Sequence, residues 1–321
     1  MSDPIASIEN TYPVKIMPPD LERYANGTEG VPFVHTFRAN APGPHVALAA
    51  IVHGNEPCGA IALDTFLREG VRPVRGTLSF VFVNISAHRA FDVANPNASR
   101  WVDEDFNRLW SPATLDGPRR SAELDRAREL RPFMDTVDLL LDIHSMQHTA
   151  EPLMMAGPVP KGVALAKDIG VPETIVIDEG HAAGPRLRDY GAFIDPGSAR
   201  NACLVECGQH WEAKAADVAL DSALRFMKAT GAIAPAVMGD VAGAPPQRVL
   251  RITERVTITS DAFAFTGQFT GMDVIADAGT VIAHDGDEPV RTPYDDCVLI
   301  MPSKRLWPGQ TAVRLGQFVP A

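Results

Sequence analysis

The chain has 321 residues, of which 45% are hydrophobic and 21% charged, a balance typical of a globular protein rather than a disordered or fibrous one. Asp and Glu total 40 and Lys and Arg total 29, which gives a net charge of −11. This acidic surplus argues against nucleic acid or an anionic membrane surface as a partner, because both attract a basic face. It does not exclude a small anionic substrate, since a site can differ in charge from the rest of the chain.

The sequence carries no pattern of secretion, membrane insertion or disulfide bonding. Its first residues lack a basic segment followed by an apolar one, so no signal peptide is expected. No apolar run approaches the roughly 20 residues that a spanning helix needs. The four cysteines, Cys58, Cys203, Cys207 and Cys297, are scattered along the chain and predict buried, reduced thiols. We therefore expect a cytoplasmic protein.

The first third of the chain predicts alternating strands and helices after a β-rich lead-in over residues 1–44. The continuous apolar run at 45–52 predicts a strand buried on both faces, and a helix with Pro57 in its first turn follows. A second buried strand is predicted at 77–84. Residues 85–118 are rich in Asn, Asp, Arg and Pro, which predicts a long loop of the kind that usually carries function.

The same alternation continues to residue 239. A helix is predicted at 121–136, a strand at 138–144 and a helix at 215–231. The segments EPLMMAG, ETIVIDEG and ACLVECG predict further strands. We therefore expect residues 1–239 to form an α/β domain with a mixed, mostly parallel sheet flanked by helices.

The pattern changes at about residue 240. Residues 240–321 consist of short alternating runs separated by Gly, Asp and Pro, which predicts a smaller all-β C-terminal module. Its stretch at 278–300 resembles a lipoyl- or biotinyl-type hairpin, but Tyr294, Asp295 and Asp296 stand where a carrier domain presents a lysine. We expect a cap or an oligomerisation module, which leaves a homo-oligomer open.

Two of the predicted strands end in side chains that bind metals. His53 and Glu56 follow the first buried strand, and His144 ends the strand at 138–144. Two imidazoles and one carboxylate form a known ligand set for catalytic zinc. A lone histidine is more often structural, so the repetition at two strand ends carries this prediction. Glu206 ends another buried strand, where a carboxylate is costly unless it faces a polar site, and it is the candidate general base.

The predicted loop contains a cluster of residues suited to binding an anion. Arg100, Asn107 and Arg108 place two guanidinium groups and an amide on one segment, and arginine can bind a carboxylate with two parallel hydrogen bonds. The alternative is that the acidic residues at 103–105 neutralise these arginines in a solvated charge cluster.

These motifs together resemble a known family. In chain order they are HGNE at 53–56, Arg100 with the pair Asn107 and Arg108, DIH at 142–144 and VECG at 205–208. The order resembles the succinylglutamate desuccinylase/aspartoacylase family over about residues 45–235, and that family is similar in fold to the zinc carboxypeptidases.

The resemblance implies a zinc-dependent deacylase that hydrolyses the amide bond of a small, anionic N-acyl amino acid. One zinc ion per chain would be held by His53, Glu56 and His144. Glu206 would be general base and acid, and Arg100 would polarise the scissile carbonyl. Asn107 and Arg108 would hold the α-carboxylate. Four further residues are candidates for a second anion pocket by position only: Arg186, Arg188, Tyr190 and Arg200.

Three other functions are compatible with the same residues. A zinc carboxypeptidase would use the same ligands and bind a peptide C-terminus with the same arginines. A homologue that lost catalysis would keep the site as a metal- or ligand-binding protein. A cysteine hydrolase would need Cys58 or Cys207 as its nucleophile, and the sequence identifies no base adjacent to either.

Overall fold

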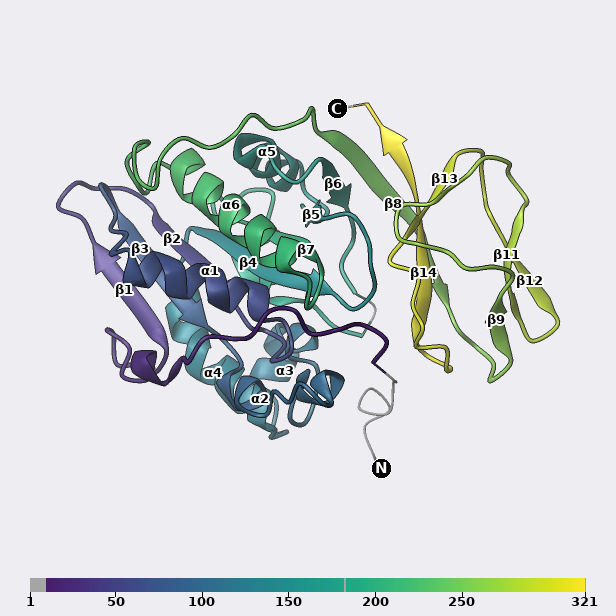
Figure 1. The fold of residues 1–321 in the computed structure, drawn as a ribbon, viewed down its shortest axis with the longest axis horizontal. Coiled ribbons are helices and arrows are strands. Elements are labelled where there is room, and N and C mark those ends of the chain that lie inside the picture. The colour runs from purple at the N-terminus through teal and green to yellow at the C-terminus, as the bar shows by residue number, and fades with distance from the viewer. Residues whose placement is uncertain (1–9, 182, 321) are drawn as a thin grey trace.

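The computed structural model describes residues 10–181 and 183–320. Within them, eleven strands form one mixed sheet in the order β1-β3-β2-β4-β7-β5-β6-β8-β14-β13-β10 (Figure 1). The bounds of these strands are β1 Val34–Arg38, β2 His45–Ala50, β3 Thr77–Phe82, β4 Leu139–Met146, β5 Leu153–Met155, β6 Thr174–Ile177, β7 Asn201–Gln209, β8 Arg248–Thr257, β10 Val274–Ile275, β13 Cys297–Ile300 and β14 Thr311–Val319. The α/β prediction is confirmed, and β3, β2, β4 and β7 run parallel to one another.

Helices cover both faces of the parallel part of the sheet. The α-helices are α1 Pro57–Arg68, α2 Ile85–Arg89, α3 Pro112–Leu115, α4 Ala122–Met134, α5 Pro160–Ile169 and α6 Ala213–Ala229. Short 3-10 turns lie at η1 Glu22–Tyr24, η2 Pro96–Ser99, η3 Phe106–Arg108, η4 Leu187–Asp189 and η5 Gly191–Phe193. The predicted loop at 85–118 therefore contains α2, η2, η3 and α3, whose length of three to five residues leaves little room for a helical period in the sequence.

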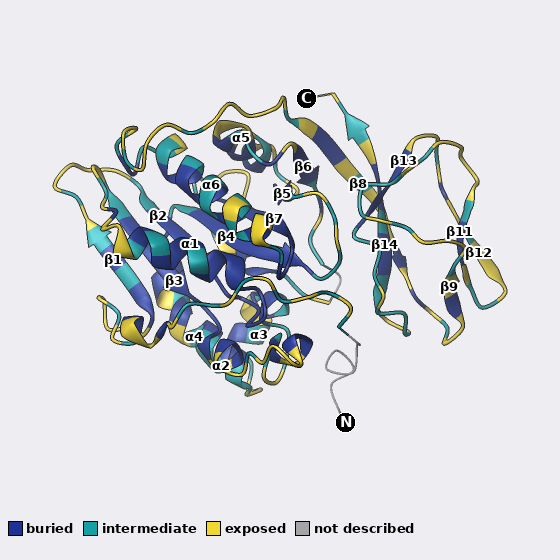
Figure 2. Ribbon diagram, viewed as in Figure 1, coloured by how far each residue is buried: buried dark blue, intermediate teal, exposed yellow. Residues whose placement is uncertain are grey.

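Alternate residues of β2 build two separate apolar cores. Val46, Leu48 and Ala50 belong to the core that α1, α5 and α6 cover. Ala47 and Ala49 belong to the core that α4 and the segment around Phe106 cover. This period of two is why the strand reads as continuously apolar, since both of its faces are buried (Figure 2). The parallel strands are thus held rigidly from both sides.

The C-terminal residues extend the same sheet and then leave it. β8 pairs in parallel with β6, and β14, β13 and β10 follow in antiparallel order. A separate three-stranded sheet is formed by β9 Phe263–Phe265, β11 Val281–Asp285 and β12 Glu288–Arg291. Figure 1 shows this part of the chain beside the α/β layers, next to β5 and β6. The segment between β13 and β14 consequently lies close to the carboxyl ends of the parallel strands, where the cavity described below opens.

Candidate active site

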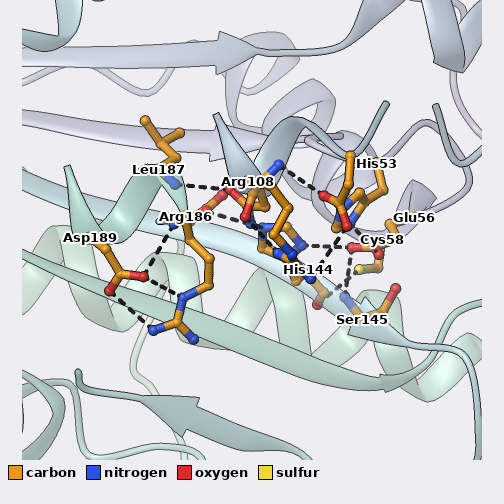
Figure 3. A network of polar contacts seen from close by, with 12 residues as sticks. His53, Glu56, Cys58, Arg108, His144, Ser145, Arg186, Leu187 and Asp189 are labelled. Carbon is orange, nitrogen blue, oxygen red and sulfur yellow. Dashed lines mark hydrogen bonds and ion pairs between the residues drawn. The ribbon is translucent and has the colours of Figure 1, made fainter. Parts of the chain in front are cut away.

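His53, Glu56 and His144 converge at the carboxyl ends of β2 and β4. One ligand atom of each lies within 4.8 Å of the others, and all three side chains are buried. The Nδ1 atoms of His53 and His144 lie 2.8 and 2.9 Å from the two oxygens of Glu56 (Figure 3). Although burial opposes it, the two imidazoles hold the pKa of Glu56 well below its usual range. The three side chains therefore present two nitrogens and an ionised carboxylate to one point, as a single divalent metal requires.

The turn that carries two of these ligands is held by close backbone contacts. Gly54 donates its backbone N–H to the carbonyl of Arg100 at 3.1 Å. A Cβ at Gly54 would overlap the backbone of Ala87 and of Ser99, so only glycine fits. Ile51, at the end of β2, has a φ of 53°, which is strained for a β-branched residue. The backbone is therefore locally strained where it places His53 in the site.

Carboxylates face the outer nitrogens of both histidines. Asp105 Oδ1 lies 2.9 Å from Nε2 of His53, and Asp142 Oδ2 lies 3.0 Å from Nε2 of His144. Such contacts fix the orientation of a ligand imidazole and raise its basicity. Asp105 also lies 3.4 Å from the guanidinium of Arg108. The sequence left open that the acidic residues at 103–105 only neutralise the arginines in a solvated charge cluster. This does not fully describe Asp105, because its carboxylate also contacts a candidate metal ligand, His53.

Glu206 lies beside the three candidate ligands, on β7. Its Cα is the register partner of His144 across the β4–β7 pair, and its side chain lines the cavity. Within the described part of the chain, its Oε2 atom is buried without a hydrogen-bond partner. Burial raises the pKa of Glu206 to about 8. A buried carboxyl group with a raised pKa and a free oxygen is able to take up and release a proton near neutral pH.

Arg100, Asn107 and Arg108 all line the cavity beside the candidate ligands, and Asn107 is buried. Arg100 donates to Glu56 Oε1 at 3.0 Å, and its Nε atom is buried with no partner among the described residues. Asn107 Oδ1 accepts the backbone N–H of Leu187 at 2.9 Å, and its Nδ2 lies 3.2 Å from His144 Nε2. The amide of Asn107 thus already bonds to the protein, although Asn107, Arg100 and Arg108 all line the cavity.

The cavity has a volume of about 340 Å³, which suits a small molecule. Its lining includes His53, His144, Glu206, Arg100 and Arg108. The C-terminal part of the chain also contributes to the lining, with residues between Met301 and Arg314. Two arginines there, Arg305 and Arg314, were missed by the sequence reasoning, because nothing local distinguishes them from surface arginines.

Comparison with known proteins shows the family to which the chain belongs. The model of the succinylglutamate desuccinylase/aspartoacylase catalytic domain matches residues 42–230, more than half of the chain. The chain belongs to this family. The resemblance drawn from the sequence motifs is therefore confirmed, and the family consists of hydrolases.

Relatives of the family match in both sequence and structure. The succinylglutamate desuccinylase of Burkholderia orbicola (strain MC0-3) is 28% identical over 293 residues, which is 83% of this chain and 79% of that protein. The structure of succinylglutamate desuccinylase from Vibrio parahaemolyticus superposes with a TM-score of 0.68 at 17% identity, covering 90% of this chain and 87% of that one. The product-bound ectoine utilization protein EutE of Ruegeria pomeroyi superposes with a TM-score of 0.59 at 17% identity, covering 88% and 87%. At these identities the structural likeness shows the fold.

Of the four residues considered for a second anion pocket in this family member, Arg186 alone lines the cavity. Its charge is already balanced, since it contacts Asp178 at 2.9 Å and Asp189 at 2.6 Å. Arg188 is fully buried and donates to the carbonyls of Ala156 and Ala202. The other two also have structural partners: Tyr190 bonds to Asp135, and Arg200 donates to the carbonyls of Val137 and Met134.

The surroundings of the cysteines do not favour a role as nucleophile. All four are buried and free of disulfide bonds. Burial and the adjacent thiol of Cys58 raise the pKa of Cys207 well above its usual range. Cys58 lies 3.7 Å from the carbonyl oxygen of His144. Because the reactive form of cysteine is the thiolate, these environments argue against a cysteine hydrolase.

No helix of the described residues is long and apolar enough to cross a membrane.

Proposed function

We propose that this protein is a zinc-dependent hydrolase that cleaves the amide bond of a small N-acyl amino acid. One observation carries the proposal. Glu206, whose buried Oε2 has no hydrogen-bond partner among the described residues, lines the same cavity as His53 and His144, and the ligand atoms of these two histidines converge with Glu56. A hydrolytic metal site needs this combination of three protein ligands, an open side and a nearby base.

The donor set fits zinc, although similar N and O sites accept cobalt or manganese. His53, Glu56 and His144 would hold the ion, one per chain. When bound, such an ion acts as a Lewis acid and lowers the pKa of a coordinated water toward about 7. The hydrogen bond between Asp105 and the outer nitrogen of His53 supports this assignment, because metal-binding histidines almost always donate their other N–H. Asp142 lies at ion-pair distance from the outer nitrogen of His144.

The remaining chemistry falls to residues that line the cavity. Glu206 accepts a proton from the attacking water and returns it to the leaving amine. Arg100 donates to the carbonyl oxygen as negative charge develops there, for which its free Nε–H is available. Arg108 binds the α-carboxylate, and Asn107 holds η3, on which Arg108 lies, against Leu187. With the substrate fixed in this way, the attack becomes effectively intramolecular.

The size of the cavity favours this function over a peptidase. A carboxypeptidase must leave room for the chain that precedes the scissile bond. Here residues of the C-terminal part between Met301 and Thr311 contribute to the lining of the cavity, and its volume is about 340 Å³. We propose that residues 240–321 form a module that caps the site, and that residues 1–239 form the hydrolase domain.

Metal analysis of the purified protein, combined with a panel of N-acetyl, N-succinyl and longer N-acyl amino acids, tests the proposal. We expect about one zinc per chain, hydrolysis that stops on chelation and activity that returns when zinc is restored. Cleavage of extended peptides but not of N-acyl amino acids would replace the proposal with a carboxypeptidase. Stoichiometric metal without hydrolysis of any compound would indicate a binding protein.

A further inference from the structure

Glu123 is a buried carboxylate that has no positively charged partner among the described residues. Its side chain is fully buried in the first turn of α4. Within residues 10–181 and 183–320, no lysine, arginine or histidine forms an ion pair with it. The N-terminus of a helix favours a carboxylate, but a fully buried one is still costly unless hydrogen-bond donors replace the water that it loses. The donors around Glu123 therefore indicate why the chain keeps a charge here.

Four N–H groups donate to Glu123, and three of them come from consecutive backbone positions. The backbone N–H of Val102 donates to Oε1 at 2.7 Å, and those of Asp103 and Glu104 donate to Oε2 at 3.0 and 3.2 Å. The side-chain amide of Asn84 donates to Oε1 at 3.1 Å. Successive backbone N–H groups that point to one side form a concave site for an anion, and here a carboxylate of the protein itself fills that site.

The three backbone donors lie between two side chains of the candidate active site. Arg100 comes two residues before the first donor, and Asp105 directly follows the third. Arg100 donates to Glu56 Oε1 at 3.0 Å, and Asp105 lies 2.9 Å from Nε2 of His53. Glu123 thus holds the short stretch of backbone from which both side chains reach the candidate metal ligands.

The helix that carries Glu123 is itself fixed to the sheet. Leu124, Ala127 and Leu130 of α4 are buried in the same apolar core as Ala47 and Ala49 of β2. Close packing makes such a core resistant to deformation. The position of the Glu123 carboxylate is therefore set by the sheet, and the segment that donates to it takes its position from there.

The donor segment has little packing of its own. Val102 and Asp103 are exposed. The side chains of Asp103 and Glu104 accept hydrogen bonds from the N-terminus of α4. Among the described residues, however, Glu123 alone accepts the backbone N–H groups of this segment. Without these three hydrogen bonds, little would fix the path of the backbone between residues 102 and 104.

We propose that Glu123 is a positioning residue of the active site. By accepting the N–H groups of residues 102–104, it sets the backbone from which Arg100 reaches the carbonyl of the substrate and Asp105 orients His53. Its kinetic consequences rest on the proposed deacylase function. Its effect on metal affinity does not, because Asp105 contacts His53 whether or not a substrate is hydrolysed.

Glu123→Gln tests the proposal, because it keeps the size of the side chain but removes the charge and turns an amide group toward N–H donors. We expect kcat for the best N-acyl amino acid to fall by about 10- to 100-fold, as a small misplacement of a catalytic group predicts. The KM should change less than about 3-fold, because Arg108 lies on η3, which Asn107 holds against Leu187. Competition against a chromogenic chelator should show a zinc affinity that is about 3- to 10-fold weaker.

Two control variants of α4 separate positioning from a loss of stability. Glu129→Gln makes the same substitution at an exposed residue whose ion pair is with Arg126, and it should match the wild type. Leu130→Val removes a buried methylene from the core and should lower the stability measured by denaturant unfolding. Its folded molecules should keep the wild-type kcat and zinc affinity. A purely structural role of Glu123 predicts that Glu123→Gln behaves in the same way as Leu130→Val, and that result would overturn the proposal.

Asn84→Ser provides the test if Glu123→Gln fails to fold. Serine can still cap α2, as Asn84 does through the N–H of Ala87, but it lacks the amide that donates to Glu123. We expect the same fall in kcat at nearly constant KM, with a smaller amplitude of about 3- to 10-fold. A wild-type kcat and zinc affinity in this variant would then overturn the proposal.

Metal affinity distinguishes a failure of this inference from a failure of the proposed function. If the wild type hydrolyses none of the N-acyl amino acids, a zinc affinity that is weakened in Glu123→Gln but not in Glu129→Gln would keep Glu123 as a positioning residue and reject the deacylase. Normal zinc affinity in both variants, together with unchanged kcat in an active enzyme, would keep the deacylase and reject the role of Glu123.

Discussion

Asp105 and His53 are joined by a contact of 2.9 Å between Oδ1 and Nε2, although 51 residues separate them along the chain. The contact connects the segment of Arg100 and Arg108 to the candidate metal ligand on the HGNE turn. It fixes which nitrogen of His53 faces Glu56, since Nδ1 lies 2.8 Å from Glu56 Oε1. The segment proposed to bind the anion and the candidate metal site are thereby linked through one carboxylate.

Asp105→Asn should weaken metal binding by about 10- to 100-fold, because the amide cannot balance the charge on the imidazole as the carboxylate does. Competition against a chromogenic chelator measures the affinity. Asp103→Asn is the control, since Asp103 caps the first turn of α4 through Ala122 and is exposed. If both variants bind zinc like the wild type, Asp105 does not orient His53.

Glu206→Gln should lower kcat by about 10²- to 10⁴-fold while zinc stays bound, since the amide cannot accept the proton from water. Turnover of the best N-acyl amino acid and metal content are measured on the same sample. Glu69→Gln, at the exposed end of α1, serves as control and should keep full activity. Wild-type turnover by the Glu206 variant would remove Glu206 from the general-base role.

Gly54→Ala should both destabilise the protein and impair the metal site. The added methyl group would overlap the backbone of Ala87 and Ser99, and overpacking of this kind costs about 1–3 kcal/mol. Denaturant unfolding and zinc content are the two measurements. Gly243→Ala provides the comparison, because a Cβ there meets nothing within 4 Å and its φ is not positive. An unchanged zinc content in the Gly54 variant would show that the turn can rearrange.

The pair of Arg186 and Asp189 should make stability depend on pH in the acid range. Although burial opposes it, Arg186 lowers the pKa of Asp189 from 3.8 to about 2. A carboxyl group whose pKa is lower in the folded state stabilises the protein above its unfolded pKa, and this contribution is lost as the pH falls from about 4 to 2. A shift of this size corresponds to about 2 kcal/mol.

Denaturant unfolding at pH 7, 4, 3 and 2 measures this contribution. Asp189→Asn should be less stable than the wild type at pH 7, and the difference should shrink toward pH 2 because the native carboxyl becomes neutral there. A constant difference between the two proteins at every pH would mean that Asp189 contributes through packing and not through its charge.

Much of the fold and the chemistry of the site follows from local sequence. Residues 46–50 are apolar at every position because alternate residues enter two different cores, and this pattern is visible without a structure. His53 lies shortly after β2 and His144 lies near the carboxyl end of β4, and parallel strands bring their carboxyl ends to one edge of a sheet. The proximity of these two histidines could therefore be predicted.

The tertiary structure alone decided which charges in the site are balanced. Arg186, Arg188 and Arg200 look alike in the sequence, yet Arg186 is paired with two aspartates and the other two hold backbone carbonyls. Arg305 and Arg314 come from a segment more than 90 residues beyond Glu206, and they reach the cavity only because β8 and β14 extend the sheet past β6. Residue type is local, whereas the partner that neutralises a charge is a long-range property that depends on how distant segments pack together.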